Sequence, residues 1–136
     1  MKIFLSYSNQ DSALARRIAE GLRREGLTVW LAEEEILPGD NWAERVSQAL
    51  TGCDAMVALV TPQTAQSGNV RWDMSYALGN KAYARRLIPV LVGTETESMR
   101  SVVPWILERF CVLRLPEPER PDQTVREIAE TLLAAA

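Results

Sequence analysis

Residues 55–78 read AMVALVTPQTAQSGNVRWDMSYAL, an apolar run followed by a breaker and then by a segment of helical character. The run at 55–60 is almost continuously apolar, which is typical of a parallel strand covered on both faces. Pro62 ends this strand, and a helix is expected from about Val70 to Asn80. Asp73 then lies in the first turns of a helix that follows a buried strand. In an open α/β sheet this is the edge where ligands bind, so Asp73 is the first candidate for a functional group.

The same alternation of strand and helix extends over the whole chain. Gly26 is expected to end the first helix, and Asp40 or Asn41 to cap the second. Strands that alternate with helices imply a mostly parallel sheet with helices on both faces. The expected strands are 3–5, 27–31, 55–60, 87–92 and 111–115. The expected long helices run from the capping residues at 9–12 to Gly26, from 41 to 52, from 70 to 80 and around 125–133. A short helical turn is also expected at 103–107.

Several local features carry more detailed expectations. Residues 32–40 are expected to form an acidic loop, which turns tightly at Pro38 and Gly39. Pro89 removes a hydrogen-bond donor from its strand, which favours an edge strand or a bulge there. The inner faces of the second and third long helices are expected to be Trp42, Val46, Ala49 and Leu50, and Met74, Ala77 and Leu78.

Size, composition and charge restrict the class of protein. The chain has 136 residues, 47% of them hydrophobic, which suits one globular domain with one core. The formal charge of −3 argues against non-specific binding of nucleic acid, which relies on basic patches. No apolar run approaches the length of a membrane span, and no signal peptide is visible. A chain that opens on a strand is expected to be a stand-alone domain or the first domain of a longer protein.

The cysteine and histidine counts narrow the chemistry. Cys53 and Cys111 each adjoin an apolar run, so they are expected to be buried free thiols in a reducing cytoplasm. There is no histidine, which excludes Ser-His and Cys-His nucleophile pairs and a histidine general base. No metal site is expected, because no cluster of ligands stands out apart from the glutamates at 33–35.

Three stretches together resemble the Toll/interleukin-1 receptor (TIR) domain family, particularly its bacterial members. The first is Ile3-Phe-Leu-Ser-Tyr-Ser8 with Asp11. The second is Gly26-Leu-Thr-Val-Trp30 with the loop that ends Ile36-Leu-Pro-Gly-Asp-Asn-Trp42. The third is Ser67 to Leu78, followed by Leu87-Ile-Pro-Val-Leu91 and Pro104-Trp105. The resemblance implies a single TIR domain over 1–136 with an α/β flavodoxin-like three-layer fold, in which helices cover a five-stranded, mostly parallel sheet on both faces.

The family resemblance implies two kinds of function. Many TIR domains cleave NAD at the nicotinamide–ribose bond and release nicotinamide with ADP-ribose or a cyclic ADP-ribose isomer, often as an antiphage signal. NAD is then the substrate, and no cofactor is implied. Other TIR domains are adaptors that assemble through one another. A nucleoside or nucleotide-sugar transferase is a third, weaker hypothesis.

The catalytic motif of the family resembles Ser-x-Trp-x-x-x-Glu. Here Ser67 matches, whereas Asn69 stands for the tryptophan and Asp73 for the glutamate. Cleavage of the glycosidic bond builds positive charge on the ribose, which a carboxylate stabilises. Asp73 is therefore the expected catalytic residue. The alternative is an ordinary surface acid that favours the helix dipole. Trp72 is aromatic but points a different way on the helix.

The expected substrate-binding residues lie after strands, in the acidic loop and before the Asp73 helix: Phe4, Ser6, Tyr7, Ser8, Trp30, Glu35 and Ser67. The serines and Tyr7 would meet a ribose or phosphate near backbone N–H groups, and Trp30 would stack on a base. The alternatives are turn and capping chemistry for residues 6–8, core packing for Trp30, and a solvated loop for the glutamates.

The family also implies partners. Its members self-associate through the loop that corresponds here to Leu37, Pro38, Gly39 and Asp40. The alternative for these four residues is an ordinary tight turn. The expected partners are therefore NAD, other TIR domains, and a fused or separate sensor or effector domain, but neither nucleic acid nor a membrane.

Overall fold

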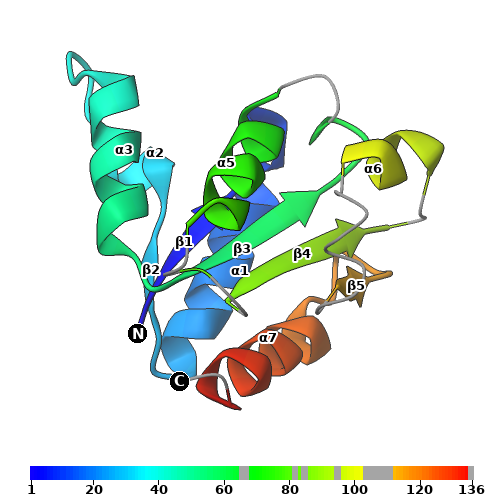
Figure 1. Ribbon diagram of the computed structural model, residues 1–136. Coiled ribbons are helices and arrows are strands. Elements are labelled where there is room, and N and C mark those ends of the chain that lie inside the picture. The colour runs from blue at the N-terminus through cyan, green and yellow to red at the C-terminus, as the bar shows by residue number, and fades with distance from the viewer. Residues whose placement is uncertain (65–67, 81–82, 84–85, 94–95, 103–111, 135–136) are drawn as a thin grey trace.

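The computed structural model contains one parallel sheet of five strands in the order β2-β1-β3-β4-β5 (Figure 1). It describes residues 1–64, 68–80, 83, 86–93, 96–102 and 112–134. The strands are β1 (Lys2–Ser6), β2 (Thr28–Trp30), β3 (Ala55–Val60), β4 (Leu87–Val92) and β5 (Leu113–Leu115). This strand order is that of flavodoxin, and the direction of winding reverses between β1 and β3. The predicted flavodoxin-like fold is confirmed.

Helices cover both faces of the sheet. The helix α1 (Ser12–Arg24) and the helix α7 (Asp122–Ala134) lie on one face, and α3 (Trp42–Gly52) and α5 (Asn69–Leu78) lie on the other (Figure 1). Alternate residues of the central strands contribute to two separate cores, as the two-residue period of a strand requires. Ile3 and Leu5 pack toward α1 and α7, whereas Phe4 packs toward α3 and α5.

Local signals in the sequence explain where the two helices nearest the site begin. The side chain of Asn41 accepts a hydrogen bond of 3.1 Å from the backbone N–H of Glu44, which caps α3. Gly68 precedes α5 with a φ of +77°, a left-handed conformation that glycine adopts without strain. Asn41, rather than Asp40, is therefore the cap of α3.

Three details differ from the sequence-based expectations. Residues 32–40 are not all loop, because α2 (Ala32–Glu35) forms one short helical turn. A further helix, α6 (Glu97–Val102), had no clear periodicity to predict it. Trp42 and Leu78 are exposed rather than packed; Trp42 is the first residue of α3 and Leu78 is the last residue of α5. The turn expected at 103–107 lies outside the described residues.

The expectation that Pro89 marks an edge or a bulge is wrong. Pro89 pairs with Ala58 inside the ladder between β3 and β4, and β4 is an inner strand. The ladder between β4 and the short β5 begins at Val90, one residue after the proline. The missing N–H therefore falls where β4 has no ladder partner in β5. The last strand, β5, forms the edge of the sheet.

Three short elements complete the described structure: the 3-10 helix η1 (Asn9–Asp11) after β1, and the helices α2 and α6 named above. None of the helices in the described part of the chain is long and apolar enough to cross a membrane.

Candidate functional site

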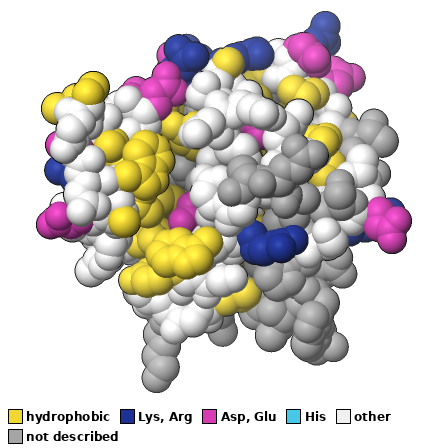
Figure 2. Space-filling model, turned by 90° about the horizontal axis from the view of Figure 1, so that it is seen from above, with side chains coloured by type: hydrophobic (Ala, Val, Ile, Leu, Met, Phe, Trp, Pro, Cys, Tyr) yellow, Lys and Arg dark blue, Asp and Glu magenta, His cyan; other side chains and the backbone are white. Residues whose placement is uncertain are grey.

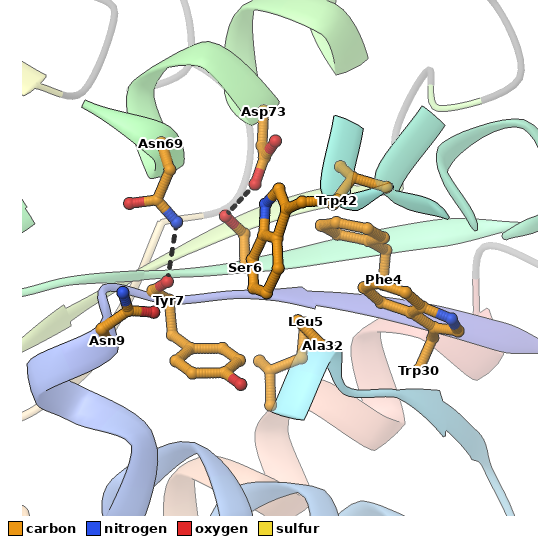
Figure 3. A pocket seen from close by; sticks show the side chains of 11 residues that line it. Phe4, Leu5, Ser6, Tyr7, Asn9, Trp30, Ala32, Trp42, Asn69 and Asp73 are labelled. Atoms are coloured by element: carbon orange, nitrogen blue, oxygen red, sulfur yellow. Dashed lines mark hydrogen bonds between the residues drawn. The ribbon is translucent and has the colours of Figure 1, made fainter. Parts of the chain in front are cut away.

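A pocket opens at the carboxyl end of β1, beside the point where the winding of the sheet reverses (Figure 3). Ligands of open α/β folds bind at this point. Its walls come from β1, β2, α2, α3 and the first turns of α5. The lining residues are Phe4, Leu5, Ser6, Tyr7, Asn9, Trp30, Ala32, Trp42, Val46, Asn69 and Asp73.

Asp73 is the carboxylate of this pocket. It lies in the second turn of α5, and only 6% of its surface is exposed. Its Oδ2 accepts a hydrogen bond of 2.7 Å from the hydroxyl of Ser6. Burial raises the pKa of Asp73 to about 6, although the Ser6 hydrogen bond lowers it. The interpretation of Asp73 as an exposed first-turn acid is therefore wrong, because the side chain points into the pocket.

Backbone and amide groups hold the polar side of the pocket together. The side-chain amide of Asn69 donates a hydrogen bond of 2.9 Å to the carbonyl oxygen of Tyr7, which ties the start of α5 to the end of β1 (Figure 3). The Tyr7 hydroxyl accepts a hydrogen bond of 3.2 Å from the backbone N–H of Glu33. Burial raises the pKa of Tyr7, so this hydroxyl stays protonated at neutral pH.

Behind the pocket, the ends of β1 and β3 are joined. The Thr61 hydroxyl donates a hydrogen bond of 2.7 Å to the carboxylate of Asp11. The backbone N–H of Thr61 donates to the Thr64 hydroxyl at 2.8 Å. These contacts fix the loops that follow both strands, so the polar groups are set in place before a ligand enters.

The other side of the pocket is aromatic. The rings of Phe4 and Trp30 are stacked, with their centroids 5.0 Å apart and their planes 11° from parallel. Both rings are buried, whereas Trp42 is 53% exposed and stands between this pair and the Ser6–Asp73 hydrogen bond in the view of Figure 3. Trp30 is therefore both a core residue and a wall of the pocket. Core packing and a contact with a ligand are compatible for this residue.

The structure brings five of the eight expected site residues together in the pocket: Phe4, Ser6, Tyr7, Trp30 and Asp73. Ser8 is buried but does not line the pocket. Glu35 is exposed at the end of the helical turn α2 and also does not line the pocket, so its role in binding substrate stays a prediction. Ser67 lies outside the described residues.

The acidic side chains of α2 have partners elsewhere. Glu33 forms an ion pair with Arg16 at 3.3 Å, and Glu34 forms one with Arg23 at 2.6 Å. The hydrogen bond from Arg23 holds the pKa of Glu34 below its ordinary value. These two glutamates therefore belong to the surface beside α1 and not to the pocket.

Sequence reasoning did not assign six of the lining residues to the site: Leu5, Asn9, Ala32, Trp42, Val46 and Asn69. In the sequence, Asn69 stands out only as a departure from the family motif. Trp42 and Val46 share a helical face by spacing, and that signal pointed to the core. The same face also borders the carboxyl end of the sheet, which only the packing of α3 reveals.

The expected self-association loop is a tight turn that stands at the surface. The backbone N–H of Leu37 donates to Oδ2 of Asp40 at 2.9 Å, and the N–H of Asp40 donates to the carbonyl of Leu37 at 3.0 Å. Gly39 has a φ of +92°, which requires glycine in this turn. The turn joins α2 to α3 at the tip of the molecule (Figure 1), and none of its four expected residues lines the pocket.

Exposed hydrophobic side chains gather on one face of the molecule. Figure 2 shows that hydrophobic side chains gather in one part of the face seen from above, whereas charged side chains lie mostly toward its margin. Leu37, Trp42 and Trp72 are among the large hydrophobic side chains that are more than half exposed. Exposed apolar side chains that gather in this way mark sites of interaction.

The described residues give little support to a function based on a metal ion or on a reactive thiol. Among them, no group of three His, Cys, Asp or Glu side chains is placed to hold a metal ion. Cys53 is a buried free thiol, as predicted, and burial raises its pKa to about 11. Cys53 is therefore not a nucleophile at neutral pH. Cys111 lies outside the described residues.

Comparison with known proteins agrees with the fold. A family model described as TIR domain matches residues 3–128. The stimulator of interferon genes protein of Magallana gigas is 28% identical over 93 residues, which are 66% of this chain and 22% of that protein. The chain thus spans about a fifth of the length of this curated relative.

Two of the solved structures that are similar to the chain contain metazoan TIR domains. A metazoan TIR-STING receptor from C. gigas, in complex with 2',3'-cGAMP, has a TM-score of 0.74 and 23% identity, over 93% of this chain and 38% of that one. The TIR domain of the Toll-related receptor TRR-2 from Hydra magnipapillata has a TM-score of 0.69 and 18% identity, over 98% of this chain and 94% of that one. Both likenesses concern the fold. All of these relatives are metazoan, so the expected bacterial origin stays a prediction.

Proposed function

The chain belongs to the TIR domain family, and on that premise we propose that its pocket binds NAD and cleaves the nicotinamide–ribose bond. The products are nicotinamide and either ADP-ribose or a cyclic ADP-ribose isomer. The observation that carries this proposal is the buried carboxylate of Asp73, held by Ser6 in a pocket whose opposite wall is aromatic.

The chemistry suits a site without histidine. As the bond breaks, its electron pair leaves with nicotinamide, and positive charge develops on the ribose. An ionised Asp73 stabilises that charge across the pocket. Nicotinamide leaves as a neutral molecule and needs no proton from a general acid. Water then attacks the ribose and loses one proton, which gives ADP-ribose, or a nitrogen of the adenine attacks instead, which gives the cyclic product.

Asp73 replaces the glutamate of the family motif and is one methylene shorter. A displacement of about 1 Å at a reacting centre costs roughly a hundredfold in rate. The Ser6 hydrogen bond restricts the carboxylate to one orientation, which offsets part of that loss. We therefore expect slow turnover.

The biological setting is part of the proposal. We place the activity in cytoplasmic immunity, with an antiphage role in a bacterial host. Activity is expected mainly in the self-assembled state, through the exposed turn at Leu37 to Asp40. Because the chain spans only a fraction of its curated relative, a fused or separate sensor or effector domain is expected to trigger assembly.

A second candidate function is a non-catalytic interaction module. It is favoured by Leu37, which is 64% exposed at the tip of the same turn, and by the two departures from the catalytic motif at 69 and 73. Such a module assembles with other TIR domains but does not cleave NAD.

Nicotinamide release from NAD tests the proposal. The assay compares the wild type with Asp73→Ala and Asp73→Glu at high protein concentration with a crowding agent. Asp54→Ala is the matched control, because this carboxylate accepts a hydrogen bond from Lys2 and lies outside the pocket. If Asp73→Ala abolishes the release of nicotinamide and the other variants retain it, the result supports the proposed enzyme. Release from Asp73→Glu alone supports the interaction module, and silence from all variants contradicts the proposed activity.

A further inference from the structure

Trp42 differs from the other aromatic side chains of the pocket. Phe4 and Trp30 are at most 6% exposed and are fixed against each other as a stacked pair. Trp42 lines the same pocket with 53% of its surface exposed. An indole in this position contributes little to the core, and it leaves a large apolar surface in water.

The position of Trp42 combines a fixed backbone with a half-exposed side chain. It is the first residue of α3, directly after the Asn41 cap, so its backbone is held by the helix. Its ring stands beside the Ser6–Asp73 hydrogen bond (Figure 3). The ring is therefore a half-exposed part of the pocket wall that is carried on a fixed backbone.

The pocket is partly open to solvent, because Asn9, Trp42 and Asn69 line it and are exposed. Its other aromatic walls, Phe4 and Trp30, are buried and stacked on each other. The ring of Trp42 is therefore the aromatic surface of the pocket that a flat ligand can reach from solvent.

From this geometry we infer that Trp42 recognises a cationic pyridinium ring, stacking on its face so that the attached ribose meets Asp73. The inference rests on the proposed function and deepens it, because it names the form of the substrate. The nicotinamide of NAD⁺ is a flat pyridinium that carries a positive charge, and tryptophan is the aromatic side chain that attracts cations most strongly. Trp42 thereby selects NAD⁺ over NADH, whose dihydronicotinamide ring is uncharged.

The same contact favours release of the product. When the glycosidic bond breaks, the ring takes the electron pair and becomes neutral nicotinamide. The attraction between the ring and the indole then loses its electrostatic part, and only the stacking remains. Trp42 therefore holds the charged substrate more tightly than the neutral product.

Binding of NAD⁺ and NADH to an Asp73→Asn background, which prevents turnover, tests this inference by calorimetry or fluorescence. In this background Trp42→Ala is expected to weaken NAD⁺ binding about tenfold or more and NADH binding, which keeps only the stacking contact, about threefold. Trp42→Phe retains part of the preference. Trp72→Ala is the matched control, because Trp72 is exposed to a similar degree (58%), does not line the pocket and stacks on Tyr76 instead.

Each outcome is informative. The inference is overturned if Trp42→Ala weakens the binding of NAD⁺ and of NADH equally, or if Trp72→Ala has the same effect as Trp42→Ala. It is also overturned if neither nucleotide binds. Nicotinamide release by the wild type is measured in parallel. Selective NAD⁺ binding through Trp42 without any release overturns the proposed enzyme but leaves Trp42 as a pyridinium-binding residue. Release that is insensitive to Trp42→Ala supports the enzyme and overturns the role of Trp42.

Discussion

The hydroxyl of Ser6 donates a hydrogen bond of 2.7 Å to Oδ2 of Asp73, across 67 positions of the chain. Ser6 is the last residue of β1, and Asp73 lies on α5, the helix that follows β3. Both side chains are buried. The contact therefore joins the two halves of the sheet at their switch point, and it sets the direction of the one carboxylate among the pocket-lining residues.

Removal of the Ser6 hydroxyl is expected to move the pH dependence of the reaction. Burial raises the pKa of Asp73 to about 6 and the Ser6 hydrogen bond lowers it, so Ser6→Ala raises this pKa further. Nicotinamide release should then fall more at pH 6 than at pH 8. Ser6→Thr keeps the donor and should keep the midpoint. A rate reduced equally at every pH would mean that Ser6 is only structural.

Asp73→Asn is expected to stabilise the protein above pH 6. The pKa of Asp73 in the folded protein is about 6, above the value of about 3.9 for a free aspartate. The folded state therefore favours the protonated form, and it loses stability as the pH rises through about 6. The loss amounts to about 3 kcal/mol at pH 8. Asparagine carries no charge but keeps an oxygen for Ser6.

Urea unfolding of the wild type and of Asp73→Asn at pH 4 and pH 8 measures this effect. The variant should gain stability over the wild type only at the higher pH. A difference that is the same at both pH values would contradict a raised pKa for Asp73.

Loss of the α3 cap is expected to weaken both stability and ligand binding. Asn41→Ala removes the acceptor for the Glu44 N–H, which costs about 1 kcal/mol of unfolding free energy. The first turn of α3 carries Trp42, so NAD⁺ affinity should fall with it. Asn41→Asp keeps a capping oxygen and serves as the control. If the urea midpoint falls but NAD⁺ affinity does not, the orientation of Trp42 does not depend on the cap.

A charge at the tip of the exposed turn is expected to disrupt self-association. Leu37→Asp places a carboxylate where an apolar side chain is 64% exposed, so folding should be unaffected. Leu133→Asp, on α7 and 56% exposed, is the matched control. Only Leu37→Asp should lose assembly, as measured by sedimentation velocity. Only this variant should also lose nicotinamide release in the activity assay. Equal behaviour of the two variants would remove the turn from the assembly surface.

The order of strands and helices was predictable because it depends on local signals. Continuous apolar runs such as 55–60 can be buried only as inner strands, and their alternation with helices implies a parallel sheet. The placement of Asp73 at the carboxyl edge follows from the same logic, since a helix that follows an inner strand begins at that edge. The family motifs that contain Ser6, Trp30 and Asp73 could also be identified from the sequence alone.

The positions of Trp42, Glu35 and Pro89 could not be predicted in this way. The helical spacing of Trp42 is the same whether its face meets the sheet or overhangs a pocket, and only the packing of α3 decides between them. Glu35 is exposed at the end of α2, a turn that has no apolar period. Pro89 lies in an inner strand because β5 is short, and the length of a neighbouring strand is not encoded locally.

The sequence by itself thus determined the elements, their order and the edge of the sheet that carries the carboxylate, because hydrophobic periodicity and capping act over a few residues. Only the tertiary structure decided which side chains meet there. The Ser6–Asp73 hydrogen bond, the Phe4–Trp30 stack and the half-exposed ring of Trp42 each join separate elements. Such contacts depend on how helices pack on the sheet, a balance of burial over the whole molecule that no short stretch of sequence contains.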